Sequence, residues 1–134
     1  MTGLPRILVA DDDRRLLESL TIRLRNAGFE VRCAEDGYQA VQLANRWRPD
    51  VAILDINMPA GDGFSVHERI KSLRGGVLEG VPIIYLTGER SPRVTRSAKA
   101  HGAFALVHKP YDAASLVETV YSALADPPEL RPIA

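Results

Sequence analysis

The sequence contains very little cysteine, no net excess of charge and no long apolar run. Cys33 is the single cysteine among 134 residues, so an intramolecular disulfide and a zinc site built on several cysteines are both excluded. We interpret Cys33, which lies in a predicted strand, as a small buried apolar side chain. No segment approaches the roughly 20 apolar residues of a membrane-spanning helix, and we expect no membrane association.

The 17 basic and 17 acidic residues balance to zero net charge. Domains that bind duplex DNA usually carry a basic excess, so we expect no direct contact with nucleic acid. The apolar stretch that starts at Ile7 is short and runs into acidic residues, unlike a signal peptide. These observations predict a cytoplasmic protein.

What the sequence does contain is a fivefold alternation of short apolar runs and amphipathic segments. Strands are predicted over 6–10, 30–34, 51–55, 82–87 and 104–107, and helices over 13–27, 37–47, 63–74, 91–102 and 113–125. Three of the strands are almost continuously apolar, which is typical of a parallel sheet covered by helices on both faces. We therefore predict one doubly wound α/β domain over residues 1–125. The proline-rich segment 126–134 is interpreted as a tail or a truncated linker.

Residue spacing predicts where several helices begin, end and face the core. Asp13 and Asp112 are placed to cap the first and last helices, and Gly75-Gly76 is expected to end the third. The predicted apolar stripes consist of Leu16, Leu20 and Leu24 in the first helix, and of Leu116, Val117, Val120, Tyr121 and Leu124 in the last.

Reactive polar residues follow four of the five predicted strands. They are Asp11 and Asp12 after the first strand, Asp55 at the end of the third, Thr87 after the fourth and Lys109 after the fifth. In open parallel sheets, ligands bind beyond the carboxyl ends of the strands. If these strands lie in one sheet, all of these side chains converge at one edge.

Phosphoryl transfer to an aspartate needs this combination of groups. A carboxylate such as Asp55 attacks phosphorus only when the charge on the phosphoryl oxygens is offset. The adjacent carboxylates of Asp11 and Asp12 repel each other unless a cation such as Mg²⁺ lies between them. Taken singly, each residue has a plainer interpretation, because aspartates cap helices and turns and most lysines are solvated.

The motifs around these residues resemble those of response-regulator receiver domains of two-component signalling, and the resemblance covers residues 6–125. The motifs are Ile7-Leu8-Val9-Ala10-Asp11-Asp12, Leu54-Asp55-Ile56-Asn57-Met58-Pro59, Asp62-Gly63, Leu86-Thr87-Gly88 and His108-Lys109-Pro110. Each motif is weak alone, but five in order at these spacings are specific. The resemblance implies a flavodoxin-like fold with five helices and a five-stranded parallel sheet in the order 2-1-3-4-5.

The resemblance also implies a function and its site. Asp55 would accept a phosphoryl group from a histidine kinase or a histidine phosphotransfer protein. Mg²⁺ would be held by Asp11, Asp12, Asp55 and the backbone carbonyl of Asn57, while Thr87 and Lys109 would bind the phosphoryl group. Such a domain is a signalling switch that assists only its own phosphorylation and dephosphorylation, and it is not an enzyme.

Three features shape how such a switch would work here. The family often has tyrosine or phenylalanine three residues before the lysine, and Leu106 occupies that position, so we expect no aromatic switch there. Asn57 and Glu89 are predicted to set the phosphate lifetime, because polar groups beside the acceptor can orient or obstruct water. Within the 90–125 face, the regularly spaced cations Arg90, Arg93, Arg96 and Lys99 are interpreted as a solvated face, or as a surface for an acidic protein or a second copy.

Two other functions are kept as alternatives. One is a degenerate receiver that binds proteins without being phosphorylated. The other is an aspartate-nucleophile phosphatase, which is disfavoured because its nucleophile would follow the first strand. His67, His101 and His108 lack metal-like spacing and are assigned no chemistry. We expect no DNA-binding or catalytic domain after residue 125, and the chain is expected to be a stand-alone receiver or one excised from a larger regulator or hybrid kinase.

Overall fold

The computed structural model describes residues 3–73 and 80–125, and every predicted element occurs within these ranges. The strands are β1 (Arg6–Ala10), β2 (Glu30–Ala34), β3 (Val51–Asp55), β4 (Ile83–Thr87) and β5 (Ala105–His108). The helices are α1 (Arg14–Asn26), α2 (Gly37–Trp47), α3 (Gly63–Ser72), α4 (Pro92–Ala100) and α5 (Ala113–Ala125). The predicted helix stop at Gly75-Gly76 and the segment 126–134 lie outside the described residues.

The five strands form one parallel sheet in the order β2-β1-β3-β4-β5, which confirms the predicted order. The central strands are buried along their whole length, since every residue of β3 and β4 is shielded from solvent. This burial explains the nearly continuous apolar runs in their sequences. β2 and β5 form the two edges of the sheet.

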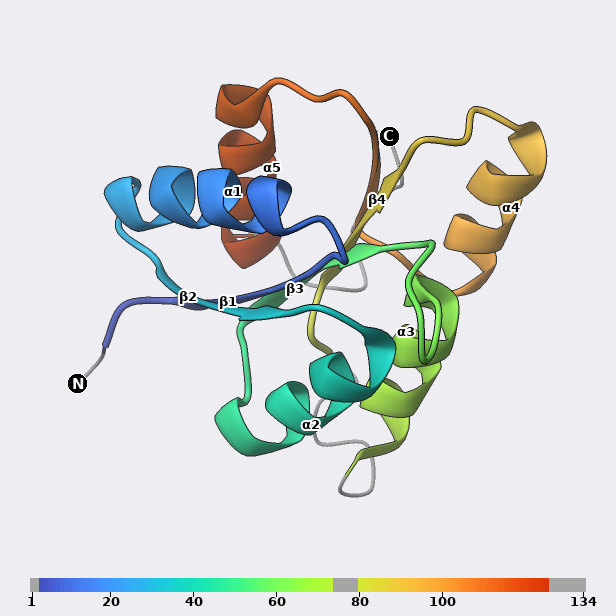
Figure 1. The fold of residues 1–134 in the computed structure, drawn as a ribbon, viewed down its shortest axis with the longest axis horizontal. Coiled ribbons are helices and arrows are strands. Elements are labelled where there is room, and N and C mark those ends of the chain that lie inside the picture. Colours follow the sequence, from blue (N-terminus) through green and yellow to red (C-terminus); the bar gives the residue numbers. More distant parts are fainter. Residues whose placement is uncertain (1–2, 74–79, 126–134) are drawn as a thin grey trace.

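Helices cover both faces of the sheet and give the domain two cores. α1 and α5 pack on one face, while α2 and α3 lie on the other (Figure 1). The buried residues of α4, Val94 and Ala98, belong to the same core as those of α2 and α3. Side chains alternate along a strand, so each strand supplies both cores. In β4, for example, Tyr85 enters the α3 side and Leu86 the α1 side.

Aspartates cap the first three helices at the end of the domain where the strands terminate. Asp13 accepts backbone hydrogen bonds from Arg15 and Leu16 at the start of α1. Asp36 and Asp62 do the same at the starts of α2 and α3. Asp112 accepts a bond of 3.2 Å from the backbone N–H of Ser115 in α5. The caps predicted at Asp13 and Asp112 are therefore confirmed.

Three predictions about burial were wrong in detail. Cys33 is exposed, because it lies on the edge strand β2. The fully buried face of α1 is formed by Leu17, Leu20 and Leu24, while Leu16 is only half-buried. In α5, Tyr121 is 49% exposed, although its hydroxyl donates a hydrogen bond to the carbonyl of Ala27.

Among the described residues, no helix has the length and apolar character needed to cross a membrane. The cytoplasmic location expected from the sequence stays a prediction.

Candidate functional site

The sheet brings the predicted site residues to one edge. Asp11 directly follows β1, Asp55 ends β3, Thr87 ends β4 and Lys109 directly follows β5. These four strands are consecutive neighbours in the sheet, and they are parallel. In the pairing of β3 with β4, Asp55 lies opposite Leu86, the residue before Thr87. The predicted convergence at the carboxyl edge is therefore present.

Three carboxylates form an acidic cluster at this edge. One oxygen from each of Asp11, Asp12 and Asp55 can be chosen so that all lie within 4.8 Å of one another. Asp11 is fully buried, Asp55 is 5% exposed, and Asp12 faces solvent. The backbone N–H of Asp13 donates to Asp11 Oδ1 over 2.9 Å and fixes its orientation. Several carboxylate oxygens with one side open to water fit a hard divalent cation such as Mg²⁺.

Lys109 supplies a positive charge to the buried acids. Its Nζ atom lies 2.8 Å from Asp11 Oδ2 and 3.6 Å from Asp55 Oδ1. Burial on its own would lower the pKa of Lys109, but the hydrogen bond and the charge of Asp11, followed by those of Asp55, raise it. Lys109 therefore stays protonated and acts as a fixed cation beside the acids. These contacts exclude the plainer interpretation of Lys109 as a solvated surface lysine.

Asp55 is held in a setting that disfavours its ionised form. Burial, and then the neighbouring charge of Asp11, raise the pKa of Asp55 from 3.8 to about 6. Lys109 and a hydrogen bond from the backbone of Asn57 act in the opposite direction but do not cancel these effects. A buried carboxylate that lacks full charge compensation is a site where a cation binds favourably.

Thr87 is fully buried at the end of β4. Its Oγ1 accepts a 2.9 Å hydrogen bond from the backbone N–H of Glu89, and its carbonyl accepts one of 2.7 Å from the backbone N–H of Lys109. The hydroxyl proton of Thr87 remains available as a donor, because Oγ1 is the acceptor in its bond to Glu89. Thr87 thus ties the β4–α4 loop and the Lys109 backbone to the same strand end.

Asn57 and Glu89 meet at the solvent side of the site. The Nδ2 atom of Asn57 lies 3.5 Å from Glu89 Oε1, and both residues are exposed. This contact joins the loop after β3 to the loop after β4, on either side of Asp55 and Thr87. The two residues predicted from sequence to border the path of water are therefore in contact with each other.

The β3–α3 loop is fixed mainly by its backbone. The N–H of Gly63 donates to Ile56 O over 2.9 Å, and the N–H of Gly37 donates to Pro59 O over 3.0 Å. A Cβ atom on Gly63 would lie 2.7 Å from the carbonyl oxygen of Asp55, and one on Gly37 would lie 2.2 Å from that of Gly61. Only glycine permits these approaches, so both glycines hold the loop against its neighbours.

Leu106 lies on β5 beside Tyr85 of β4, and it packs on the core that α2, α3 and α4 share. An aromatic residue is therefore present at this level of the sheet, but on the neighbouring strand. The hydroxyl of Tyr85 forms a hydrogen bond with His67, a buried histidine to which the sequence analysis assigned no role. Two signals in the sequence could have pointed to this pair: Tyr85 precedes Thr87 by two residues, and His67 lies next to Val66, a buried residue of α3.

Arg90, Arg93, Arg96 and Lys99 are all exposed. Within residues 3–73 and 80–125, none of them forms an ion pair with an acidic side chain. Arg90 lies in the β4–α4 loop and the other three lie in α4, all of them open to solvent.

Comparisons with known proteins agree with this geometry. A family model described as the response regulator receiver domain matches residues 7–121. The transcriptional regulatory protein PrrA of Mycobacterium tuberculosis is 39% identical over 120 residues, which cover 90% of this chain and 50% of PrrA. The DNA-binding response regulator MtrA of Mycobacterium leprae is 36% identical over 133 residues, covering 96% of this chain and 57% of MtrA. The chain thus spans about half the length of these curated relatives.

Solved structures show the same fold. The chemotaxis response regulator CheY4 of Vibrio cholerae superimposes with a TM-score of 0.83 at 32% identity, covering 91% of this chain and all of CheY4 (100%). A putative response regulator from Chloroflexus aurantiacus gives a TM-score of 0.84 at 30% identity, with 93% of this chain and 100% of that chain covered.

Proposed function

Because the chain belongs to the response regulator receiver domain family, we propose that Asp55 accepts a phosphoryl group from a phosphohistidine of a histidine kinase or phosphotransfer protein. The observation that carries this proposal is the position of Asp55, which is buried at the carboxyl edge between two further acids and Lys109. The domain would act as a signalling switch that assists its own phosphorylation and dephosphorylation.

The reaction exchanges one bond to phosphorus for another. A carboxylate oxygen of Asp55 attacks the phosphorus atom, an acyl phosphate forms, and the bond from phosphorus to the donor histidine breaks. The histidine nitrogen leaves with the electron pair of that bond. Asp55 must be ionised to attack, which the neighbouring charge of Lys109 favours. Burial of Asp55 keeps bulk water away from the nucleophile.

The residues present fit a magnesium ion. Asp11, Asp12 and Asp55, with the backbone carbonyl of Asn57, would hold Mg²⁺, which supplies charge that offsets the phosphoryl oxygens. Lys109 would pair with a phosphoryl oxygen, since its ammonium group already lies 3.6 Å from Asp55 Oδ1. Thr87 would donate its free hydroxyl proton to another phosphoryl oxygen.

The test is the mass of the intact protein after incubation with acetyl phosphate and Mg²⁺. We expect one phosphate adduct that is absent in Asp55→Asn. Asp50→Asn is a matched control, because Asp50 precedes the same strand at its opposite end and binds the backbone of Arg6. No adduct in the unmodified protein would leave the degenerate receiver, the alternative that Leu106 keeps open although the intact site residues argue against it. Turnover of unrelated phosphomonoesters would instead indicate a phosphatase.

The four exposed cations of the β4–α4 loop and α4, Arg90, Arg93, Arg96 and Lys99, support a proposal about the partner of this switch. Among the described residues, these four cations form no ion pair with an acidic side chain, so they would attract an acidic protein surface, and binding would weaken as salt screens the charges. A second copy of the chain is the other candidate within the 90–125 face, and equilibrium sedimentation with and without acetyl phosphate distinguishes the two. MtrA is named as DNA-binding, and the absence of nucleic-acid binding by residues 1–125 stays a prediction.

A further inference from the structure

Tyr85 lies at the centre of the sheet on the same face of β4 as Thr87. Side chains two residues apart on a strand share a face, and Tyr85 is fully buried. Its backbone neighbours are Leu54 on β3 and Leu106 on β5. The aromatic ring that lies beneath the phosphorylation site therefore comes from β4, while β5 contributes a leucine beside it.

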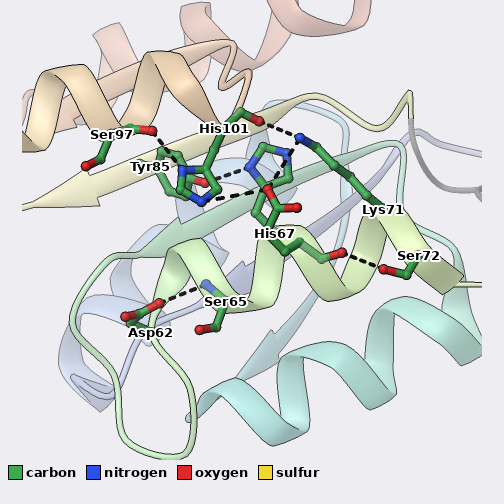
Figure 2. Close-up of polar contacts among 9 residues, drawn as sticks. Asp62, Ser65, His67, Lys71, Ser72, Tyr85, Ser97 and His101 are labelled. Atoms are coloured by element: carbon green, nitrogen blue, oxygen red, sulfur yellow. Dashed lines mark hydrogen bonds and ion pairs between the residues drawn. The ribbon is translucent and has the colours of Figure 1, made fainter.

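A hydrogen bond from α3 fixes the position of this ring. The hydroxyl of Tyr85 lies 2.6 Å from Nδ1 of His67, which is 3% exposed (Figure 2). Burial foremost, and then the charges of Lys71 and His101, lower the pKa of His67 to about 3, while burial raises that of Tyr85. Both groups are therefore neutral at physiological pH, and the tautomer of His67 determines which of the two donates in this hydrogen bond.

The same side of α3 holds the C-terminal end of α4. The ring of Phe64 packs edge-on against Tyr85 and stacks on His101, with centroids 4.9 and 4.8 Å apart respectively. Nζ of Lys71 donates to the carbonyl of His101 over 2.8 Å, as Figure 2 shows. Glu68 lies 3.7 Å from Nε2 of His101. His101 follows the last residue of α4, so each of these contacts acts on that end.

The N-terminal end of α4 is held much less firmly. All six residues from Gly88 to Arg93 are exposed, and Val94 is the first buried residue after Thr87. A Cβ atom added to Gly88 would meet no other atom within 4 Å. This segment connects directly to Thr87, whose Oγ1 is bonded to the backbone of Glu89. A shift of Thr87 would therefore be transmitted first to the start of α4.

We propose that Phe64, His67, Tyr85 and His101 form an α3–α4 anchor that fixes the C-terminal end of α4. When Thr87 moves toward a phosphoryl group, the N-terminal end of α4 moves with it and the helix pivots about His101. Tyr85 and His67 are positioning residues in this arrangement. The proposal rests on phosphorylation of Asp55, and it gives the ring of Tyr85, which lies beside Leu106, a fixed positioning role in place of an aromatic switch.

The test is hydrogen exchange of individual backbone amides, measured by NMR with and without excess acetyl phosphate and Mg²⁺. In the unmodified protein, we expect phosphorylation to change exchange at residues 93–95 at least about fivefold, and at 98–103 less than about twofold. The double variant His67→Leu/Tyr85→Phe removes both hydrogen-bonding partners and leaves no buried polar group unpaired. In it, amides 98–103 should exchange about tenfold faster, and they should also respond to phosphorylation.

Ile83→Val is the matched control, because Ile83 is buried on the same face of β4 and the change removes packing alone. The proposal is overturned if both ends of α4 respond equally in the unmodified protein, or if the double variant behaves like Ile83→Val. If the double variant does not fold, the comparison of the two ends in the unmodified protein decides. Intact mass is measured on the same samples. A missing adduct refutes the phosphorylation of Asp55, whereas an adduct with equal changes in amide exchange at both ends of α4 refutes the anchor alone.

Discussion

The Nζ atom of Lys109 donates a 2.8 Å hydrogen bond to Oδ2 of Asp11, across the carboxyl edge of the sheet from β5 to β1. Asp11 is fully buried, and this contact supplies it with a charged partner. A divalent cation that binds Asp11 would compete with Lys109 for the same carboxylate. Release of the ammonium group would then make it available to a phosphoryl oxygen.

Substitution of Lys109 should therefore separate cation binding from phosphate capture. Lys109→Gln keeps a polar side chain, one atom shorter, but removes its charge, so Mg²⁺ should bind about fivefold more tightly, or by roughly 1 kcal/mol. The yield of phosphate adduct should fall, because the phosphoryl oxygens lose their cation. Isothermal titration calorimetry and intact mass measure the two effects, with Lys99→Gln as an exposed control. Weaker Mg²⁺ binding in Lys109→Gln would contradict the competition.

Asp55→Asn should stabilise the metal-free protein in a pH-dependent way. The pKa of Asp55 is about 6 in the fold and 3.8 as a reference, so the folded state binds the extra proton between these values. In the unmodified protein, the stability that this proton contributes is complete below about pH 3.8 and is lost as the pH rises through about 6. Asparagine has no such pH dependence, so the variant becomes the more stable protein at high pH. At pH 8 in EDTA, the variant should exceed the unmodified protein by up to roughly 3 kcal/mol.

Urea denaturation at pH 4, 6 and 8 measures this difference, which should vanish at pH 4. Mg²⁺ should reduce it at pH 8, since the cation compensates the ionised carboxylate. Asp50→Asn should show no comparable gain. Equal stability of Asp55→Asn and the unmodified protein at pH 8 would argue that Asp55 carries no electrostatic strain.

Removal of the Asn57–Glu89 contact should shorten the life of the acyl phosphate. The two side chains span the mouth of the site at 3.5 Å, and we expect them to obstruct water. Asn57→Ala/Glu89→Ala should therefore lose phosphate about tenfold faster, equivalent to roughly 1.4 kcal/mol in the barrier. Decay of the adduct by mass after removal of acetyl phosphate measures the rate, and Arg90→Ala is the control. A slower or unchanged rate would show that these groups do not obstruct water.

The anchor should also be visible in acid stability. The pKa of His67 is about 3 in the fold against a reference of 6.5, so only the unfolded state takes up this proton between those values. The stability that neutral His67 contributes is complete above about 6.5 and is lost progressively as the pH falls toward about 3. Between pH 6 and pH 4, the free energy of unfolding of the unmodified protein should fall more steeply than that of His67→Leu/Tyr85→Phe, by about 1.4 kcal/mol per pH unit.

Chemical denaturation between pH 6 and pH 4 measures this difference in the free energy of unfolding. The other titratable groups that face His67 are unchanged in the variant: Lys71 and Glu68 on α3, and His101 after α4. Asp55 titrates in the same range with the opposite sign, but its contribution is common to both proteins and cancels in the difference. Parallel pH profiles would mean that His67 is not kept neutral by burial.

The element order and the convergence of the site could be predicted from the sequence because both depend on local patterns. The apolar run before Asp55 marks a buried strand, and the cap at Asp13 marks the helix that follows β1. Burial at the edge of the sheet could not be predicted from those patterns. Cys33 lies in the predicted strand 30–34, yet it is exposed on β2, which has a neighbour on one side only.

Contacts between distant segments account for what the sequence did not predict. His67 and Tyr85 are 18 positions apart, and their pairing depends on how α3 lies across β4. A lone histidine in a helix and a lone tyrosine in a strand give no separate sign of each other. The charge network at Lys109 was predictable only in outline, because the shorter contact is to Asp11, and Asp55 is the more distant acid.

The backbone attachment of the β3–α3 loop has a consequence for how such a domain can diversify. Gly63 and Gly37 hold this loop through main-chain hydrogen bonds and close approaches, independently of the side chains at positions 57, 59 and 60. Those side chains are exposed, so they can be exchanged without displacing Asp55. Under the proposed function, substitution at these positions would change how long the acyl phosphate persists while Asp55 stays in place.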